Sequence, residues 1–198
     1  SPGGWVKAVC IVQARMGSSR LPGKVLEPLG DHTVLAEVLG RCAMIPGIDL
    51  VCCAVPEGEA DEAVAIEAQR CDATVTRGSS HDVLARYAVA ARATAADIVL
   101  RVTSDCPLLD PELAGEVLAC VARGAADYAC NNLPPSFPHG LDCEAFRAAT
   151  LHDAELEAAS PHQREHVTPW MRNNGALRRD RVKGPGGEVA TWRWTLDW

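Results

Sequence analysis

The sequence lacks several features that would assign a cellular role directly. No apolar run approaches the roughly 20 residues needed to cross a membrane, and residues 1–4 have neither the basic region nor the apolar core of a signal peptide. Basic residues are also in deficit, because 19 Lys and Arg against 26 Asp and Glu give a formal net charge of −7. A field of that sign repels nucleic acid and anionic membranes. We therefore expect neither as a partner, and any anion must bind at a local cluster of basic residues.

Paired cysteines are missing as well. The nine cysteines are odd in number, form no C-x-x-C motif and lie mostly inside apolar segments. That pattern is typical of reduced, buried thiols and not of a disulfide framework. The sequence therefore predicts a cytoplasmic protein whose core contains free cysteines.

The order of apolar and amphipathic segments indicates the fold class. A chain of 198 residues with 47% hydrophobic content fits one domain. Short apolar runs that alternate with helical patterns are typical of a parallel sheet with helices on both faces. Expected strands are residues 8–12, 50–55, 73–75, 97–102 and 127–130, and expected helices are residues 34–43, 59–70, 82–94 and 111–123. Asp110, just before Pro111, is the expected N-cap of the last of these helices.

The pattern changes after residue 130. Residues 131–138 are rich in Asn and Pro, which excludes a regular core element, while the alternation at residues 140–144 favours an exposed or edge strand. Residues 151–173 are predicted to be mostly helical, with a break near Ser160. Residues 178–189 are predicted to form a basic, Gly-rich loop and residues 191–197 a final strand.

A basic loop follows the first predicted strand. Arg15, Arg20 and Lys24 place three cations within ten residues of an otherwise acidic protein, and Gly17 and Gly23 allow close approach of the backbone to a ligand. Ligands of parallel sheets bind beyond the carboxyl ends of the strands, and Arg and Lys bind phosphate oxygens. The spacing matches neither a Walker A loop nor a G-x-G-x-x-G motif. The residues alone therefore predict a phosphate-binding loop of no standard type, with a solvated connecting loop as the alternative.

The same segment carries a family resemblance. Residues 11–26, IVQARMGSSRLPGKVL, resemble the nucleotide-binding signature of cytidylyltransferases, in particular the CMP–sugar-acid synthetases and the SpsF-like proteins of spore-coat polysaccharide biosynthesis. The resemblance continues in order through RGS at residues 77–79, DVLARY at 82–87, RVTSDCPLLDP at 101–111, GLDCE at 140–144, REHVTP at 164–169 and RWTLD at 193–197. It implies a Rossmann-like nucleotide-diphospho-sugar transferase fold over residues 5–198, with a mainly parallel central sheet and helices on both faces.

The resemblance also implies an activity and a nucleotide site. CMP would pass from CTP to a hydroxyl of a sugar acid, with Mg²⁺ bound and pyrophosphate released, in surface polysaccharide or glycoconjugate biosynthesis. Arg15, Arg20, Lys24 and Asp105 would be catalytic, and Asp105 and Asp197 would bind the metal. From the residues alone, a carboxylate at a strand end is more often a turn former, but beside a triphosphate loop it fits the way Mg²⁺ is held by one or two carboxylates and phosphate oxygens. The nucleotide contacts implied are Gln13, Ala14, Arg15, Met16, Gly17, Ser18, Ser19, Arg20, Lys24, Arg77, Ser79, Arg86, Arg101, Thr103 and Asp105.

An acceptor pocket and a dimer follow from the same resemblance. The acceptor would be a sugar acid, with phosphonates and sugar phosphates as alternatives, and its implied contacts are His139, Asp142, Glu144, Arg164, Glu165, His166 and Arg193. Residues 131–146 resemble the protruding arm with which such enzymes form homodimers, so Phe137, Leu141 and Phe146 would be buried against a partner. Relatives continue with a turn and a helix beyond the end of these 198 residues.

Two rival functions compete with this hypothesis. His162, Glu165 and His166 form an H-x-x-E-H pattern, which is found in inverted zinc peptidases, with Glu165 as the base and His139 or Glu144 as a third ligand. Alternatively, the chain is a homodimeric nucleotide-binding module that keeps the fold without turnover. The zinc hypothesis explains five residues, whereas the resemblance covers nearly the whole chain, so the cytidylyltransferase hypothesis is favoured.

Overall fold

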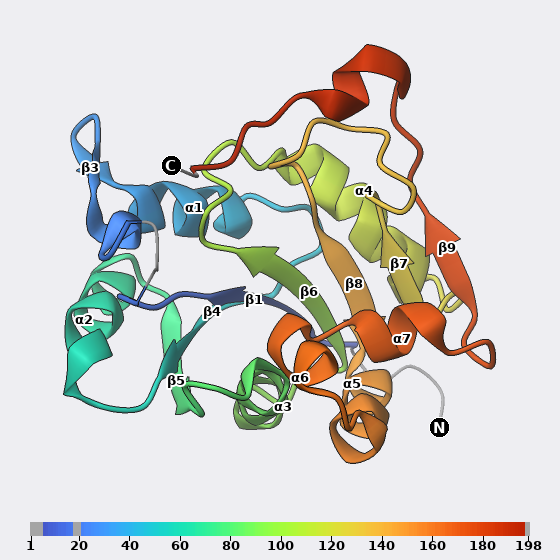
Figure 1. Cartoon of the computed structure of the whole chain (residues 1–198), viewed down its shortest axis with the longest axis horizontal. Helices are drawn as coiled ribbons and strands as arrows, with labels where there is room; N and C mark the ends of the chain where they lie inside the picture. The colour runs from blue at the N-terminus through green and yellow to red at the C-terminus, as the bar shows by residue number, and fades with distance from the viewer. Residues whose placement is uncertain (1–5, 18–20, 197–198) are drawn as a thin grey trace.

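A seven-stranded sheet forms the centre of the molecule. The structure, a computed structural model, describes residues 6–17 and 21–196, and within them the sheet has the order β5-β4-β1-β6-β8-β7-β9 (Figure 1). The strands are Ala8–Gln13 (β1), Pro28–Leu29 (β2), His32–Thr33 (β3), Leu50–Pro56 (β4), Thr74–Gly78 (β5), Ile98–Thr103 (β6), Tyr128–Cys130 (β7), Glu144–Arg147 (β8) and Arg179–Arg181 (β9). β2 and β3 form a separate antiparallel hairpin, and within the large sheet only β8 runs antiparallel to its described neighbours. The mainly parallel sheet predicted from the sequence is confirmed.

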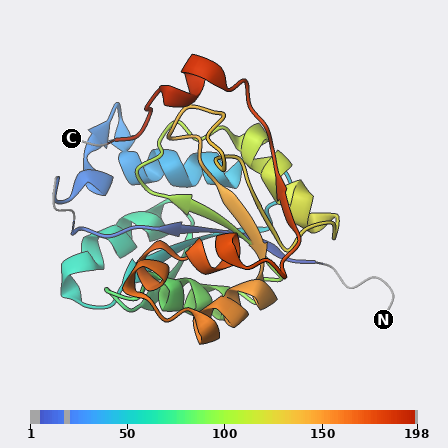
Figure 2. The same cartoon turned by 45° about the vertical axis from the view of Figure 1, so that its right-hand side comes forward.

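Helices cover both faces of this sheet (Figure 2). They are Val34–Ala43 (α1), Glu62–Arg70 (α2), Val83–Ala93 (α3), Pro111–Ala122 (α4), Ala148–Glu157 (α5), Pro161–His166 (α6) and Pro169–Asn173 (α7), with 3-10 turns Lys24–Leu26 (η1), Glu59–Asp61 (η2) and Gly187–Thr191 (η3). α1, α2 and α4 contribute to one apolar core, and α3, α5 and α7 to the other. Val12 of β1 packs in the first core and Ile11 in the second, because successive side chains of a strand point to opposite faces. A strand buried on both sides shows an unbroken apolar run, which is why β1 was recognisable in the sequence.

Polar caps set the ends of the helices. The Asp110 side chain accepts from the backbone N–H of Glu112 and Leu113, so its predicted role as N-cap of α4 is confirmed. The Asp82 side chain accepts from Ala85 N at 2.9 Å and begins α3 in the same way. The backbone break predicted near Ser160 is also present, because Ser160 begins α6 in a capping box. These caps fix where each helix begins relative to the strand before it.

The prediction of an exposed or edge strand at residues 140–144 is wrong, whereas the dimerisation arm at residues 131–146 stays a prediction. The strand is β8, Glu144–Arg147, which pairs with β6 on one side and β7 on the other and lies inside the sheet. Phe146 has no exposed surface and Leu141 is buried, so both pack within this chain and are not available to a partner. The physical reason is that two neighbouring strands cover both edges of β8, which no local alternation could reveal.

The basic C-terminal part of the chain also differs from the expectation. β9, Arg179–Arg181, pairs in parallel with β7 inside the segment predicted to be a loop. Of the predicted strand at 191–197, the described residues form only an isolated bridge between Arg193 and His139, preceded by the η3 turn. All three residues of β9 are exposed and charged. Backbone hydrogen bonds hold this strand, and they leave no apolar pattern in the sequence.

The cysteines agree with the prediction of free thiols. None of the nine forms a disulfide within the chain, and all but Cys71 are buried. Burial raises the pKa of the Cys53 thiol to about 12, so this group stays protonated at neutral pH. Among the described residues, no helix has the length and apolarity of a membrane span.

Candidate active site

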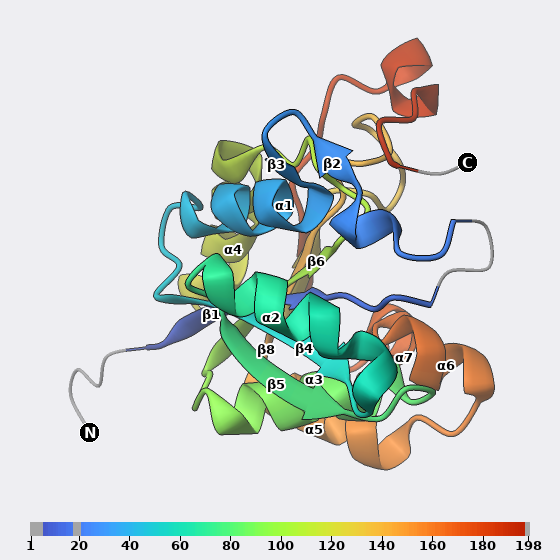
Figure 3. The ribbon, with the colours of Figure 1, turned by 90° about the vertical axis from the view of Figure 1, so that its left-hand side faces the viewer.

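A large cleft opens beyond the carboxyl ends of β1 and β6. Its volume is about 670 Å³, which is within the range of small-molecule sites. Figure 3 shows the end of β1 running between α6 and the segment that contains η1. The lining residues come from four parts of the chain: the segment after β1, the start of α3, the end of β6 with the turn that follows, and the end of α6. The cleft therefore lies where the fold class places its ligands.

The loop after β1 is pinned at both ends by hydrogen bonds. Met16 N donates to Asp61 Oδ1 at 2.6 Å, and Gly23 N donates to the Met16 carbonyl at 2.8 Å. Gly23 has a φ of 74°, a left-handed conformation that favours glycine, and η1 begins immediately after it with Lys24. The turn thus returns Lys24 to the cleft. Asp61 was missed in the sequence analysis, and its position just before a helix was the available signal.

Cationic side chains line this cleft. Arg15, Lys24, Arg86 and Arg101 all contribute to its wall. Arg86 is only 2% exposed; its Nη1 donates to the Ser79 carbonyl at 2.9 Å, and its Nε has no hydrogen-bond partner among the described residues. Burial lowers the pKa of the Arg86 guanidinium below its ordinary value. Four cations at one cleft in a protein of net charge −7 indicate an anionic ligand.

The backbone beside Arg86 leaves room for this side chain. A Cβ added at Gly78 would lie 2.9 Å from the Arg86 Cγ and 3.1 Å from its Cα. Gly78 ends β5, so the strand and α3 approach more closely than a larger residue would permit. The glycine therefore allows a buried arginine to reach the cleft.

Asp105 also lines the cleft, next to Lys24. Thr103 Oγ1 donates to Asp105 Oδ1 at 2.6 Å, and Lys24 Nζ lies 3.9 Å from Asp105 Oδ2. The side chains of Lys24 and Asp105 are 19% and 28% exposed. Leu196 N donates to the Asp105 carbonyl at 3.0 Å, and Lys24 Nζ donates to the Leu196 carbonyl at 3.3 Å. The last described residue therefore meets the loop and the acidic turn at one corner.

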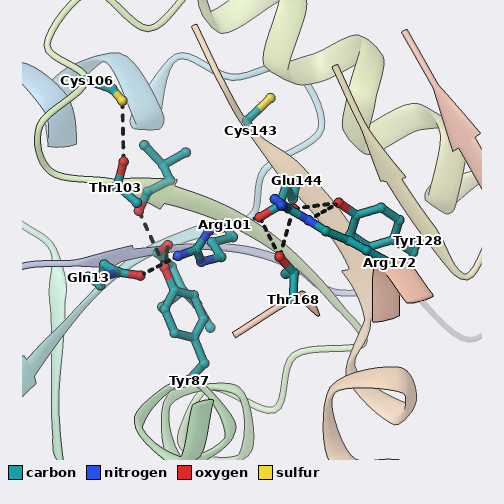
Figure 4. Close-up of polar contacts among 12 residues, drawn as sticks. Gln13, Tyr87, Arg101, Thr103, Cys106, Tyr128, Cys143, Glu144, Thr168 and Arg172 are labelled. Carbon is teal, nitrogen blue, oxygen red and sulfur yellow. Dashed lines mark hydrogen bonds and ion pairs between the residues drawn. The ribbon is translucent and has the colours of Figure 1, made fainter. Parts of the chain in front are cut away.

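A buried ion cluster stands behind the cleft (Figure 4). Arg101 Nη1 donates to Glu144 Oε2 at 2.9 Å, while its Nη2 donates to Gln13 Oε1 at 3.1 Å. The Arg101 guanidinium also lies 5.7 Å from the centre of the Tyr87 ring, within cation–π range. Contacts with Glu144, Gln13 and Tyr87 therefore fix the orientation of the Arg101 side chain at the cleft wall.

Glu144 is the centre of that cluster. Tyr128 Oη donates to Glu144 Oε1 at 2.5 Å, Thr168 Oγ1 donates at 2.9 Å, and Arg172 Nε at 2.9 Å. Burial would raise the pKa of the Glu144 carboxyl, but the charges of Arg101 and Arg172 outweigh burial and hold this pKa below its ordinary value. The carboxylate is therefore ionised and its oxygens are committed to these donors.

The link between α6 and α7 is strained at Val167. This β-branched residue has φ 69° and ψ −54°, and Thr168 N donates to the His166 carbonyl at 2.8 Å. Such a γ-turn is rare for a non-glycine residue, and a strained residue persists only where its surroundings fix it. Here Val167 is fully buried and Thr168 is bonded to Glu144. The turn places His166 at the cleft and Thr168 in the ion cluster.

The structure brings most of the predicted nucleotide residues together. The predicted site residues that line the cleft are Gln13, Ala14, Arg15, Gly17, Lys24, Arg86, Arg101, Thr103, Asp105, Glu165 and His166. Ser18, Ser19, Arg20 and Asp197 lie outside the described residues. Val25, Ser80, His81, Val83 and Ser104 also line the cleft and were not predicted. Ser80 and His81 follow the recognised RGS segment directly, which was the signal available for them.

Other predicted site residues are not part of the cleft lining. Arg77 forms an ion pair with Glu62 at 2.5 Å, and Ser79 Oγ accepts from the backbone N–H of Asp82 at 3.0 Å. Arg164 Nη2 donates to Asp82 Oδ2 at 2.6 Å and so ties α6 to α3. The remaining residues outside the lining are Met16, His139, Asp142, Glu144 and Arg193.

Two of those remaining residues form an ion pair of their own. His139 Nδ1 contacts Asp142 Oδ2, and His139 is bridged to Arg193 by backbone pairing. Burial raises the pKa of the Asp142 carboxyl, while the neighbouring His139 opposes that shift. This group joins the 139–142 turn to the C-terminal segment beside the cleft.

The zinc alternative finds no support. The rings of His162 and His166 lie 4.6 Å apart between centroids, but His162 is exposed and does not line the cleft. Residues 6–17 and 21–196 contain no group of three His, Cys, Asp or Glu side chains that could hold a metal ion. A zinc peptidase needs three protein ligands, so this hypothesis is not carried further.

The fold and the cleft together define a class of protein. A mainly parallel sheet, covered on both faces and bearing a cationic cleft at its strand carboxyl ends, is typical of α/β proteins that bind phosphorylated ligands. A profile of the cytidylyltransferase family matches residues 9–189 of this sequence. The chain belongs to the cytidylyltransferase family, and the enzyme class predicted from the sequence is confirmed.

Individual relatives agree with this assignment. The spore coat polysaccharide biosynthesis protein SpsF of Bacillus subtilis is 33% identical over 174 residues, which are 85% of this chain and 71% of that protein. A 3-deoxy-manno-octulosonate cytidylyltransferase of Anaeromyxobacter is 34% identical over 125 residues, or 62% of this chain and 50% of that protein. The solved structure of a cytidylyltransferase from Leptospira borgpetersenii superimposes with a TM-score of 0.92 at 29% identity, covering 98% of this chain and 82% of that one.

Proposed function

We propose that the protein transfers CMP from CTP to a hydroxyl of a carboxylate-bearing sugar, with release of pyrophosphate, in the synthesis of a surface polysaccharide or glycoconjugate. The names of the relatives support this choice, since one is a polysaccharide biosynthesis protein and another a cytidylyltransferase for a sugar acid. The observation that carries the proposal is the cleft that Arg15, Lys24, Arg86 and Arg101 line together with Asp105.

The proposed reaction gives the basic side chains of the loop after β1 a role in binding phosphate. The acceptor hydroxyl oxygen attacks the α-phosphorus of CTP, the bond from that phosphorus to the bridging oxygen breaks, and pyrophosphate takes the bonding electrons. The hydroxyl proton passes to solvent. Negative charge grows on the phosphate oxygens in the transition state, so Arg15 and Lys24 contribute mainly by positioning and by charge neutralisation. Arg20, in the same loop, has the same proposed role.

Asp105 fits the proposed Mg²⁺ site. Asp105 lines the cleft, and its Oδ1 accepts from the Thr103 hydroxyl and the Cys106 thiol. Its Oδ2 lies 3.9 Å from Lys24 Nζ and retains acceptor capacity. Leu196 brings the segment before Asp197 to the same corner, and Asp197 is proposed as the second ligand. Mg²⁺ usually takes only one or two carboxylates and completes its shell with phosphate oxygens and water. When bound, the ion would neutralise phosphate charge as a Lewis acid.

The acceptor is proposed to lie between α6 and the end of β6. Glu165 and His166, at the end of α6, line the cleft. The Arg101 guanidinium is fixed there by Glu144 and Gln13, and its charge would attract the acceptor's carboxylate. The further acceptor contacts proposed from the family resemblance are His139, Asp142, Glu144, Arg164 and Arg193.

Pyrophosphate release tests the function. The protein is incubated with CTP, Mg²⁺ and a panel of sugar acids, neutral sugars, sugar phosphates and phosphonates, and we expect release only with a sugar acid. Arg15→Gln should lower kcat/KM by roughly tenfold or more, the loss of one contact worth about 1.4 kcal/mol. Arg92→Gln is the matched control, because Arg92 pairs with Glu155 outside the cleft lining.

Other results would contradict the proposal. Release with phosphonates or sugar phosphates alone would overturn the sugar-acid assignment and retain the cytidylyltransferase. Tight CTP binding with no release for any acceptor would favour a binding module without turnover. Equal losses of kcat/KM in the Arg15 and Arg92 variants would show that the cleft takes no part in the reaction.

We also propose, from the family resemblance, that the enzyme is a cytoplasmic homodimer. Sedimentation equilibrium of the chain would test the dimer. A monomer at micromolar concentration would overturn it without touching the proposed chemistry.

A further inference from the structure

A second cavity lies on the sheet at β7 and β9. Its volume is about 370 Å³, and it is bounded by Tyr128, Arg172, Arg181 and Leu133 among other residues. None of its lining residues belongs to the lining of the nucleotide cleft. Arg172 comes from α7, which covers this face of the sheet (Figure 1). The cavity, which we call the arginine pocket, is therefore a separate site.

Strand register turns two arginines of β9 toward this pocket. Arg179 pairs with Tyr128 and Arg181 with Cys130, so each shares a sheet face with its partner. Tyr128 and Cys130 belong to the core on the α3 and α7 side. Arg179 and Arg181 therefore join Arg172 on one face, and three guanidinium groups surround the cavity.

The carboxylate between them points the other way. Asp180 pairs with Ala129, whose side chain lies in the opposite core. Burial and then the charge of Asp180 raise the pKa of Cys120, a residue of α4 on that opposite face. Asp180 is one of the residues that line the pocket, but its carboxylate interacts with α4 and with the Arg181 backbone N–H, and it forms no ion pair with the described arginines.

The three arginines retain hydrogen-bond donors that bind no described residue, and Arg179 and Arg181 also lack an ion-paired carboxylate. Arg172 donates through Nε and Nη2 to Glu144, which leaves its Nη1 without a hydrogen bond to any described residue. Arg179 Nη1 donates to the neutral Arg172 carbonyl. In the described part of the chain, no carboxylate forms an ion pair with Arg179 or Arg181, and the Arg181 guanidinium donates no hydrogen bond. Arg179 and Arg181 have no ion-paired carboxylate and lie near the guanidinium of Arg172, whose counterion is Glu144. Because like charges repel one another, a bound anion would lower the energy of this arrangement.

We propose that the arginine pocket binds a small organic anion that carries a carboxylate or phosphoryl group. Guanidinium groups match both oxyanions with two parallel hydrogen bonds. Tyr128, Cys130 and Leu133 give the pocket an apolar wall as well, which suits the carbon skeleton of an organic anion better than a bare ion. Glu144 bonds Arg172 through Oε1 and Arg101 through Oε2, so one carboxylate separates this site from the nucleotide cleft. The proposal does not rest on the proposed transfer reaction.

Calorimetric titration at low ionic strength tests the site with two probes, citrate for carboxylates and inorganic phosphate for phosphoryl groups. We expect at least one probe to bind the wild-type protein. The double variant Arg179→Gln/Arg181→Gln should bind that probe about tenfold or more weakly, which corresponds to about 1.4 kcal/mol or more of binding free energy. Arg181→Gln alone should weaken it less. This single variant removes a side chain with no hydrogen bond to the described residues, so it keeps the test valid if the double variant does not fold.

Two controls separate this pocket from other basic surfaces. Arg70→Gln with Arg123→Gln removes the same charge from exposed positions outside both sites and should leave affinity within twofold. Arg15→Gln with Lys24→Gln removes binding of the probes to the nucleotide cleft and should leave the affinity of the arginine pocket unchanged. Absence of binding for both probes, or equal weakening by the β9 and control pairs, would overturn the proposal. Loss of binding only in the cleft pair would assign the anion to the nucleotide site instead.

Discussion

Two carboxylates near the end of β6 show how surroundings decide what an acidic residue does. Glu144 pairs across the sheet with Arg101, is 2% exposed and accepts hydrogen bonds from four side chains, those of Arg101, Tyr128, Thr168 and Arg172. Asp105 follows the end of β6, is 28% exposed in its side chain and faces the cleft beside Lys24. The first charge is committed to the architecture, whereas the second retains acceptor capacity for a ligand. The two positions should therefore respond in opposite ways to loss of charge.

The largest expected effect is on stability, at the buried position. Glu144→Gln removes the negative charge and leaves Arg101 and Arg172 uncompensated in the interior. Breaking a buried pair in this way costs about 3–5 kcal/mol, so the free energy of unfolding should fall by that amount in chemical denaturation. Glu157→Gln, at an exposed position of α5, is the control and should change little. A loss below about 1 kcal/mol at Glu144 would show that the cluster is not a structural centre.

The next effect is on activity, at the open position. Asp105→Asn should lower kcat by roughly 10²- to 10³-fold in the pyrophosphate assay, the range for removing one preorganised electrostatic contact. The free energy of unfolding should stay within about 0.5 kcal/mol of the wild type. Asp153→Asn, on the exposed side of α5, serves as the matched control. Full activity of the Asp105→Asn variant would show that the Asp105 carboxylate is not needed for the reaction.

A smaller effect on stability is expected when one hydrogen-bond donor to Glu144 is removed. Thr168→Val keeps the side-chain shape but deletes the hydroxyl that lies 2.9 and 3.1 Å from the two Glu144 oxygens. Hydrogen bonds to charged groups contribute about 1.5–3 kcal/mol, and unfolding in denaturant should show that loss. Thr74→Val, at an exposed position of β5, is the control. In a double-mutant cycle with Glu144→Gln the two losses should not add, because they remove the same interaction. Additive losses would contradict the role of Thr168 in the cluster.

The smallest effect is the pH dependence of the same interaction. The pKa of Glu144 in the folded protein lies below its ordinary value of 4.5, so its charge stabilises the fold above that value. This contribution is lost as the pH falls through the lower folded-state pKa. The difference in unfolding free energy between wild type and Glu144→Gln should therefore narrow on acidification below 4.5. If this difference in unfolding free energy stayed constant as the pH fell, the pKa of Glu144 would be the same in the folded and unfolded states, and the prediction would be wrong.

Strands and helices of the parallel half were predictable because each carries a local signal. The predicted helix 34–43 coincides with α1, Val34–Ala43, since apolar spacing marks its buried face and Pro46 and Gly47 follow its end. The proximity of Lys24 and Asp105 was also foreseeable, because the carboxyl ends of neighbouring parallel strands meet at one edge of the sheet.

The antiparallel half could not be predicted in the same way. β8 is interior because β6 and β7 happen to flank it, and β9 is a strand although all three of its side chains are exposed and charged. The position of Glu144 depends on donors from β6, β7 and the α6–α7 link, and no single stretch of sequence contains that information.

The order of apolar segments, the helix caps and the basic loop were determined by sequence alone, because each depends on residues within a few positions of one another. The tertiary structure decided which charged side chains are paired within the protein and which remain available to a ligand. Burial and long-range pairing set the energy of a charged group, and both arise only when distant segments pack together.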